Sequence, residues 1–221
     1  MKRRFAINIL CIPFFVLVVL LDCSKGSEPY YPLKEGLTRE YNISQEFRYR
    51  DSGGFAHNQS VTVKMLNTYL ASRELKGKKV TPATNKAESY ILLYFLAEDN
   101  NGIYIFASQE PEDVEPEIVS TPIYEIKYPI QVGTTWDETS KSALADFNVP
   151  PKITIDKVDE VVTVATGTFN GCVRIKKIGA IKKKCEKHQA SDHIVTIEIE
   201  EYFWYASGVG LIKQITKCTQ E

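Results

Sequence analysis

The sequence predicts a mainly β protein, built as an antiparallel barrel or as one strongly curved sheet. Three observations support this fold class. Apolar and polar residues alternate over long stretches, turn sequences separate these stretches, and no stretch of twelve or more residues carries a clear helical stripe. Alternation with a period of two places one face of a strand against a core. Long strands of this kind need closure or cover, because exposed edges pair with other chains.

The first predicted element is a β-hairpin near the start of the mature chain. Residues 37–50 alternate between apolar and polar side chains over fourteen positions, and residues 61–69 begin a second alternating run. Between the runs, residues 51–54 have the composition of a turn. Two alternating runs on either side of a turn are typical of a hairpin.

A second hairpin is predicted in the middle of the chain. Residues 90–96 and residues 103–106 flank the sequence Asp99-Asn100-Asn101-Gly102. The Asn-Gly pair suits the positive φ angles of a tight hairpin turn. Short apolar runs between residues 153 and 178 predict further strands.

The C-terminal hairpin repeats this layout. Residues 194–205 precede a turn at residues 206–210, and residues 211–217 follow it. Glycine adopts positive φ without a Cβ clash, so at least one of Gly208 and Gly210 is expected to need that conformation.

Two polar segments are predicted to lie outside the core. Residues 108–122 contain three prolines and five acidic residues, which favours a connection between two halves of the chain. Residues 182–188 are rich in lysine and are expected to form a solvated hairpin loop.

The chain contains an internal similarity. Residues 32–40 and residues 129–137 share a proline, a branched apolar residue, a glycine, a threonine and a final acid at the same spacing. Two further matches follow in the same order, and they join residues 80–84 to 162–166 and Tyr94-Phe95 to Tyr202-Phe203. This order predicts a duplicated β-meander with halves at residues 31–108 and 123–221. The alternative is that the segments are unrelated, because proline, glycine and threonine are common between the strands of any β protein.

The N-terminus has the layout of a secretory signal. Three basic residues precede an apolar stretch over residues 5–21, which only Asn8 and Pro13 interrupt. Its length is at the lower limit for crossing a bilayer with a core of about 30 Å. Residues 1–22 are therefore predicted to be a signal peptide and are left out of the fold.

The end of this stretch resembles a known processing site. Leu20-Leu21-Asp22-Cys23 is similar to the lipobox of bacterial lipoproteins, in which a peptidase cuts before a cysteine that carries diacylglycerol. Asp22 departs from the small residue of that family. The resemblance implies a lipidated tether at residues 23–30, attached to the membrane through Cys23, followed by a single β-rich domain at residues 31–221. The alternatives are an uncleaved anchor, or an ordinary Cys23 with cleavage nearby, for example after Gly26.

The charge of the mature chain argues against a nucleic-acid partner. Cleavage before Cys23 removes three basic residues and one acidic residue, so the formal charge falls from −1 to −3. A weakly acidic chain without a segregated basic patch does not fit phosphate binding.

Three cysteines remain in the mature domain, which allows at most one internal disulfide. If residues 206–210 close the last hairpin, Cys218 lies roughly opposite Glu198 and near the loop that carries Cys185. A Cys185–Cys218 bridge is therefore preferred over Cys172 as a partner. The main alternative leaves all three thiols free.

No catalytic motif or cofactor is predicted. The three histidines do not sit in a nucleophile motif, and the chain has no phosphate-binding glycine loop. Metal-type donors gather only in the loop at residues 185–193, and these are Cys185, His188, Asp192 and His193. The neighbouring lysines disfavour a cation, so a polar loop is preferred, and an enzyme using this loop is the rival hypothesis.

Several turn sequences together resemble landmarks of a group of uncharacterised bacterial envelope lipoproteins. These are residues 31–36, 129–136, 165–172 and 205–213. The resemblance implies a β-rich architecture in the cell envelope and, with Ser24 after the cysteine, attachment to the outer membrane where the cell has one. One departure is Arg39, where Trp136 leads us to expect an aromatic residue. The expected function is a non-enzymatic binding or structural module whose concave sheet face takes an apolar ligand or an envelope protein.

Overall fold

The computed structural model describes residues 29–50, 54–87, 90–137, 151–184 and 194–220. These residues form twelve strands and no helix, which confirms the mainly β fold class. The strands are β1 (Thr38–Arg50), β2 (Ala56–Tyr69), β3 (Arg73–Leu75), β4 (Lys78–Lys86), β5 (Ile91–Asp99), β6 (Gly102–Gln109), β7 (Glu117–Lys127), β8 (Thr135–Asp137), β9 (Lys152–Val164), β10 (Gly167–Lys184), β11 (Ile194–Ala206) and β12 (Gly210–Gln220).

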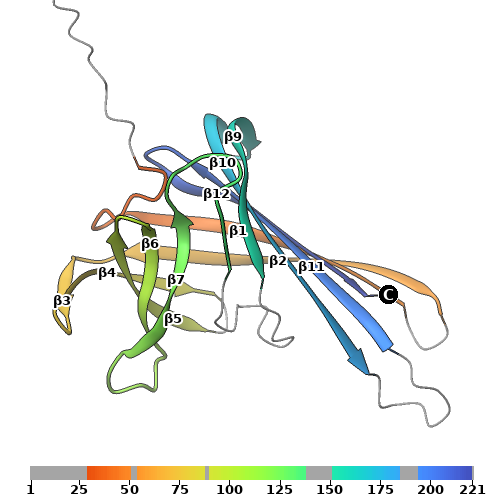
Figure 1. Ribbon diagram of the computed structural model, residues 1–221, viewed down its shortest axis with the longest axis horizontal. Coiled ribbons are helices and arrows are strands. Elements are labelled where there is room, and N and C mark those ends of the chain that lie inside the picture. The colour runs from red at the N-terminus through yellow and green to blue at the C-terminus, as the bar shows by residue number, and fades with distance from the viewer. Residues whose placement is uncertain (1–28, 51–53, 88–89, 138–150, 185–193, 221) are drawn as a thin grey trace, which may run out of the picture.

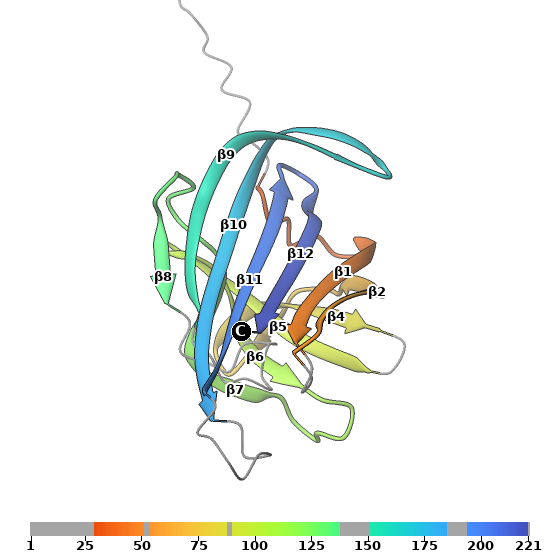
Figure 2. The ribbon, with the colours of Figure 1, turned by 90° about the vertical axis from the view of Figure 1, so that its right-hand side faces the viewer.

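The strands follow one another around a single strongly curved sheet (Figures 1 and 2). Their order is β7-β6-β5-β4-β2-β1-β12-β11-β10-β9-β8, and β3 pairs with β4 beside this path. The pairs are antiparallel except for β1 with β12, which places the first and last strands side by side in parallel. The strongly curved sheet predicted from the sequence is therefore confirmed, with one parallel pair.

The two ends of the sheet approach each other, so that the sheet forms an uneven ring. The Trp136 indole on β8 donates a hydrogen bond to the Tyr124 carbonyl oxygen on β7 at 3.2 Å. Branched apolar side chains from both ends pack inside the ring, and these are Ile103, Ile126, Ile153, Ile155, Val173 and Ile175. Side-chain packing joins the two ends, whereas no backbone pairing links β7 to β8 in the described chain.

Residues 29–37 form an N-terminal strap that is tied to one end of the ring. The Pro29 carbonyl accepts from the Gly208 amide, and the Tyr30 hydroxyl donates to the Gly171 carbonyl, both at 3.0 Å. The next apolar residues, Tyr31 and Leu33, pack against the core inside the ring.

Beyond the ring, parts of β1, β2, β10, β11 and β12 continue as a long ribbon (Figure 1). Strand β2 passes from the exposed ribbon into the buried interior of the ring. Residues 56–62 are exposed, whereas Asn67 and Tyr69 are buried. The ribbon is therefore held mainly by backbone pairing, while the ring is held by packing.

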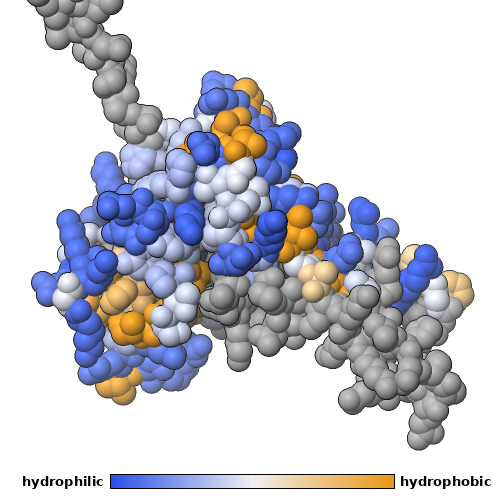
Figure 3. Space-filling view, in the orientation of Figure 1, coloured by the Kyte–Doolittle hydropathy of each residue, from blue (hydrophilic) through white to orange (hydrophobic). Residues whose placement is uncertain are grey.

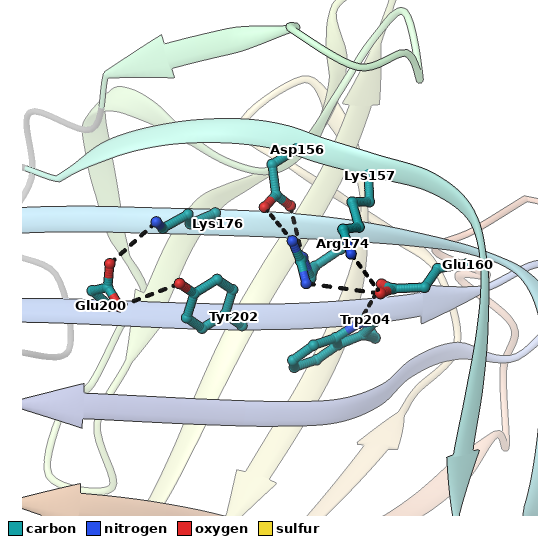
Figure 4. A network of polar contacts seen from close by, with 8 residues as sticks. All are labelled: Asp156, Lys157, Glu160, Arg174, Lys176, Glu200, Tyr202 and Trp204. Atoms are coloured by element: carbon teal, nitrogen blue, oxygen red, sulfur yellow. Dashed lines mark hydrogen bonds and ion pairs between the residues drawn. The ribbon is translucent and has the colours of Figure 1, made fainter.

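The β9–β10 hairpin arches over the outer face of the sheet (Figure 2). Beneath it lies a second small core of Val162, Cys172, Trp204 and Ala206. Figure 4 shows the polar contacts that fix this arch. Arg174 donates to both oxygens of Asp156 at 2.9 and 2.6 Å, and the Trp204 indole donates to Glu160 at 2.8 Å. The hydrogen bonds with Asp156 raise the pKa of Arg174 above its usual value.

All three predicted hairpins are confirmed, as β1–β2, β5–β6 and β11–β12. In the central turn, Asp99 Oδ1 accepts from the amides of Asn101 and Gly102 at 2.8 and 3.1 Å. In the last turn, Gly208 and Gly210 have φ of 70° and 90°, as expected for a turn that needs glycine.

Two predictions about polar segments are wrong in part. Residues 117–122, expected to connect two halves, begin strand β7, which runs to Lys127. Pro122 is tolerated because it lies in the last strand of the sheet path, where the ladder to β6 is interrupted. Residues 182–184, expected in a loop, end strand β10, because their pairing with β11 continues to Lys184.

Candidate functional site

The two similar turn segments have the same backbone structure. Gly36 and Gly133 both have positive φ, 75° and 92°. Each glycine amide donates at 2.9 Å to a carbonyl of the neighbouring strand, Gly36 to Tyr69 and Gly133 to Ile155. The amide of that neighbour donates back to the residue after the glycine, at 3.0 and 2.9 Å. Tyr69 and Ile155 therefore occupy equivalent places.

The strands that follow these turns also correspond. Strands β1-β2-β4-β5-β6 and β8-β9-β10-β11-β12 are two antiparallel meanders of five strands each. The match of Tyr94 with Tyr202 falls on the fourth strand of each meander. The match of residues 80–84 with residues 162–166 falls on β4 and on the end of β9, which are not equivalent strands. Two of the three matches thus have equivalent places, and a duplication stays a prediction.

The meanders differ at one inward-facing pair of residues. Three positions after each glycine stand Arg39 and Trp136. Trp136 is paired with Ile153 across β8 and β9, and both are buried in the core. Arg39 is paired in the same way with Asn67 across β1 and β2. We call Trp136 with Ile153 the apolar pair, and Arg39 with Asn67 the polar pair.

The polar pair is held by its neighbours inside the ring. Arg39 Nη1 donates to the Tyr69 hydroxyl at 3.3 Å, and its guanidinium lies 5.2 Å from the centre of the Tyr69 ring. A Cβ on Gly210 would lie 3.0 Å from this guanidinium, so glycine there leaves room for Arg39. Asn67 Nδ2 donates to Asn85 Oδ1 at 2.5 Å.

One polar atom on each member of the pair lacks a hydrogen bond. Arg39 Nη2 and Asn67 Oδ1 are both buried from solvent, and neither has a partner within the described part of the chain. A buried polar group without a partner costs about 1–3 kcal/mol, and more when it is charged. Few such groups persist in native proteins, so each calls for an explanation. Here one is a donor and the other an acceptor, on paired residues.

Neutral tyrosine hydroxyls surround this pair. The Tyr31 ring lies 6.5 Å from that of Tyr69, edge to face, and 5.8 Å from that of Tyr205. Burial raises the pKa of Tyr41 to about 12. Burial raises the pKa values of Tyr31 and Tyr205 well above the usual 10, and the second-largest cause is Tyr69 for Tyr31 and the Glu125 carboxylate for Tyr205. These phenols therefore stay protonated at physiological pH.

Apolar side chains continue from the polar pair along the same face of β1 and β2. The next cross-strand pairs on this face are Tyr41 with Met65 and Ile43 with Val63. All four side chains are half-buried. Because alternate residues share a face of a strand, they form an apolar track that leads from the polar pair toward the ribbon.

The polar pair does not line either of two hollows in the described chain. One, of about 750 Å³, is lined by Leu33 and Leu96 from the core and has Lys79, Glu98 and Tyr128 among its polar residues. The other, of about 300 Å³, lies on the ribbon and is lined mainly by charged residues, namely Glu46, Arg48, Glu198, Glu200 and Lys217. On the face in Figure 3, apolar residues form small patches bordered by hydrophilic ones.

No family model, curated protein or solved structure matches this chain. The resemblance to envelope lipoproteins therefore stays a prediction. Cys23 lies outside the described residues, so its lipidation also stays a prediction. The described residues contain no helix that is long and apolar enough to span a membrane.

The metal and disulfide candidates fall mostly outside the description. Cys185, His188, Asp192 and His193 are not among the described residues. Within those residues, no three metal-binding side chains come together. Cys218 on β12 is paired with Ile199 on β11, one residue from the predicted Glu198. The Cys185–Cys218 bridge stays a prediction.

Sequence reasoning found half of the polar pair. Arg39 stood out because Trp136 fills the same place in the other segment. Asn67 was passed over, although its signal was present: it falls on the apolar face of the run Val61, Val63, Met65, Asn67 and Tyr69. A polar residue on an otherwise apolar strand face departs from the pattern that core packing favours. Such departures are expected at functional sites.

Proposed function

We propose that this protein is a membrane-tethered, non-enzymatic binding module of a bacterial envelope, and that it holds an amphiphilic ligand inside its ring. One observation carries the proposal. A polar pair with two unpartnered buried atoms stands where the equivalent half of the fold has an apolar pair. A ligand that supplied the missing hydrogen bonds would offset the cost of burying these atoms.

The chemistry of the polar pair defines the polar end of the ligand. Arg39 Nη2 can only donate a hydrogen bond, and Asn67 Oδ1 can only accept one. A hydroxyl or a primary amide can satisfy both atoms, because each of these groups both accepts and donates. The protonated phenols of Tyr31, Tyr41 and Tyr205 offer further hydrogen bonds to such a group.

The track on β1 and β2 defines the rest of the ligand. Tyr41, Ile43, Val63 and Met65 offer an apolar surface that begins beside the polar pair. An acyl or similar hydrocarbon chain that packed along the track would gain about 25 cal/mol of favourable free energy for each Å² of apolar surface buried. A lipid with a hydroxyl-bearing or amide-bearing head group fits both parts of the site.

Native mass spectrometry of the protein purified from its own cell envelope tests this proposal. The parent should retain a lipid, which organic extraction releases for identification. The double variant Arg39→Met/Asn67→Leu should lose it, because the apolar side chains cannot bond the head group. Arg48→Met is the control, since residue 48 is exposed on the opposite face of the same strand.

Three results would contradict the proposal. The parent could carry no organic molecule, the double variant could retain the lipid as fully as the control, or the parent could hold stoichiometric zinc. The last result would favour the rival enzyme that uses the loop at residues 185–193.

Attachment to the membrane is tested separately. If Cys23 carries lipid, the parent partitions into detergent, and Cys23→Ala releases the protein or blocks its processing. Two acyl chains suffice for stable anchoring, whereas one alone binds weakly. Cys11→Ala, in the predicted signal peptide, is the matched control. Unchanged retention and mobility of Cys23→Ala would leave a simple signal or an uncleaved anchor.

A further inference from the structure

Three segments that meet at one end of the molecule carry no charged side chain. They are the start of the N-terminal strap at residues 29–33, the outer part of the β9–β10 hairpin at residues 161–173, and the β11–β12 turn with its flanks at residues 202–212. The Pro29 carbonyl accepts from the turn and the Tyr30 hydroxyl donates to the hairpin, so the three segments are in contact. We call them the uncharged end. It lies at the top of the ring in Figures 1 and 2.

The outward surface of the uncharged end combines an apolar side chain with hydroxyl groups. Within the hairpin, Val162 and Cys172 belong to the small core beneath it, whereas Val161 is 62% exposed. The exposed Thr163 and Thr168 are bonded to each other through their hydroxyls at 3.0 Å. Such a surface can enter the head-group region of a bilayer without taking a charge out of water, which would be costly.

The opposite side of the ring is acidic. The connection between β6 and β7 lies at the bottom in both views, away from the uncharged end (Figures 1 and 2). Residues 110–116 contain no basic residue, and their exposed acids are Glu110, Glu112, Asp113 and Glu115. The negative surface potential of anionic lipids repels such a loop. The charge distribution therefore favours contact of a membrane with the uncharged end.

The length of the N-terminal segment favours the same orientation. Cys23, with its predicted lipid, stands six residues before Pro29, and six residues span at most about 22 Å. An uncleaved anchor ending at Leu21 would be eight residues away, which is at most about 29 Å. Because Pro29 is bonded to the β11–β12 turn, either attachment holds the membrane beside the uncharged end.

From these observations we infer that the uncharged end is the membrane-facing surface of the protein, and that its partner is the bilayer that holds the N-terminus. The inference rests on the membrane attachment proposed above and is independent of the ligand inside the ring. The backbone of the hairpin limits the depth of contact. In the described chain, the strand ladder of residues 161–171 joins them only to each other, and hydrocarbon offers no partner to the other backbone groups. The contact is therefore at the level of the head groups.

Tryptophan quenching by brominated lipids tests this orientation. The full chain, purified from a bacterial envelope with its own attachment, is placed in vesicles of phosphatidylethanolamine and phosphatidylglycerol with brominated acyl chains. Val161→Trp should be quenched several-fold more than Val114→Trp, the matched control. Val114 is 96% exposed and lies in the acidic connection between β6 and β7. The parent gives the background from Trp136 and Trp204, which are both buried.

A second position guards against a local effect of the first substitution. Thr168→Trp, on the neighbouring strand of the same hairpin, should be quenched as strongly as Val161→Trp. Both positions are exposed, so each variant should keep the urea unfolding midpoint of the parent. If one variant unfolds early, the other decides.

Flotation of the same vesicles separates this inference from the attachment on which it rests. A full chain that does not float with the vesicles would overturn the attachment and the inference together. A chain that floats while both hairpin variants are quenched no more than Val114→Trp would overturn the inference alone. Stronger quenching of Val114→Trp would also overturn it, and would place the acidic connection against the bilayer.

Discussion

The polar pair and the apolar pair occupy the same place in two meanders whose first turns make the same backbone hydrogen bonds. At one place Trp136 and Ile153 pack tightly and close the ring. At the other, Arg39 and Asn67 leave a donor and an acceptor unpartnered. The backbone accepts either chemistry, so packing does not dictate the polar choice. Where a chain departs from the choice that stability favours, a functional constraint is the usual reason.

The largest expected difference between the pairs is in stability. Ile153→Ala should lower the free energy of unfolding by about 2–5 kcal/mol, because a fully buried side chain is lost and a cavity remains. Asn67→Ala should cost about 1 kcal/mol, since it removes one hydrogen bond and one unpartnered oxygen. Urea unfolding followed by tryptophan fluorescence measures both. Equal losses would show that the polar pair is a structural element of the core.

Converting the polar pair into an apolar one is expected to stabilise the protein. Arg39→Met/Asn67→Leu should raise the free energy of unfolding by about 1–2 kcal/mol, because replacing buried unpartnered polar groups by apolar ones removes their desolvation cost. The measurement is urea unfolding of protein freed from bound lipid. A loss of stability of similar size would mean that Arg39 and Asn67 hold the ring together.

Substitution is expected to cost the same stability at the two glycines that begin the meanders, Gly36 and Gly133. Gly36→Val and Gly133→Val should each cost about 1–3 kcal/mol, because a β-branched residue is strained at positive φ. A Cβ would meet no atom within 4 Å at either position, so strain alone decides the cost. Unfolding midpoints that differ widely between the two variants would show that the turns are not equivalent.

The smallest effect at neutral pH concerns Tyr41, beside the polar pair. Folding raises its pKa from 10.0 to about 12, so it contributes stability that is fully present below pH 10 and is lost as the pH rises through 12. Tyr41→Phe should leave the stability at pH 7 nearly unchanged and reduce its fall between pH 10 and 12. Tyr90→Phe, at an exposed tyrosine, is the control. An unchanged alkaline profile for Tyr41→Phe would contradict the burial of its hydroxyl.

The hairpins could be predicted because their alternation and turn residues are local signals. The beginning of β2 was missed, since residues 57–60 are polar on both faces and show no alternation. Residues 117–122 looked like a linker because the charges and proline of an edge strand resemble those of a loop. The strand order and the contact between Trp136 and Tyr124 join distant parts of the chain, for which single-sequence patterns carry no signal.

The site was less predictable than the fold. Arg39 was visible only through comparison with Trp136 in the other half of the same chain. Its role depends on its contacts with Tyr69 and Gly210, and these contacts are set by strand register. The unpartnered atoms themselves are three-dimensional facts that no spacing in the sequence encodes.

The N-terminal strap has a mechanical consequence. Any pull on the residues before Pro29 reaches the body of the protein through Pro29 and Tyr30, which are bonded to the turn after β11 and to the β9–β10 hairpin. The force is shared between two hairpins from the start, and the partly buried Tyr31 and Leu33 must be pulled away from the core before β1 can separate from its neighbours. A domain tied in this way should resist extension from its N-terminus better than one whose first strand forms a bare edge.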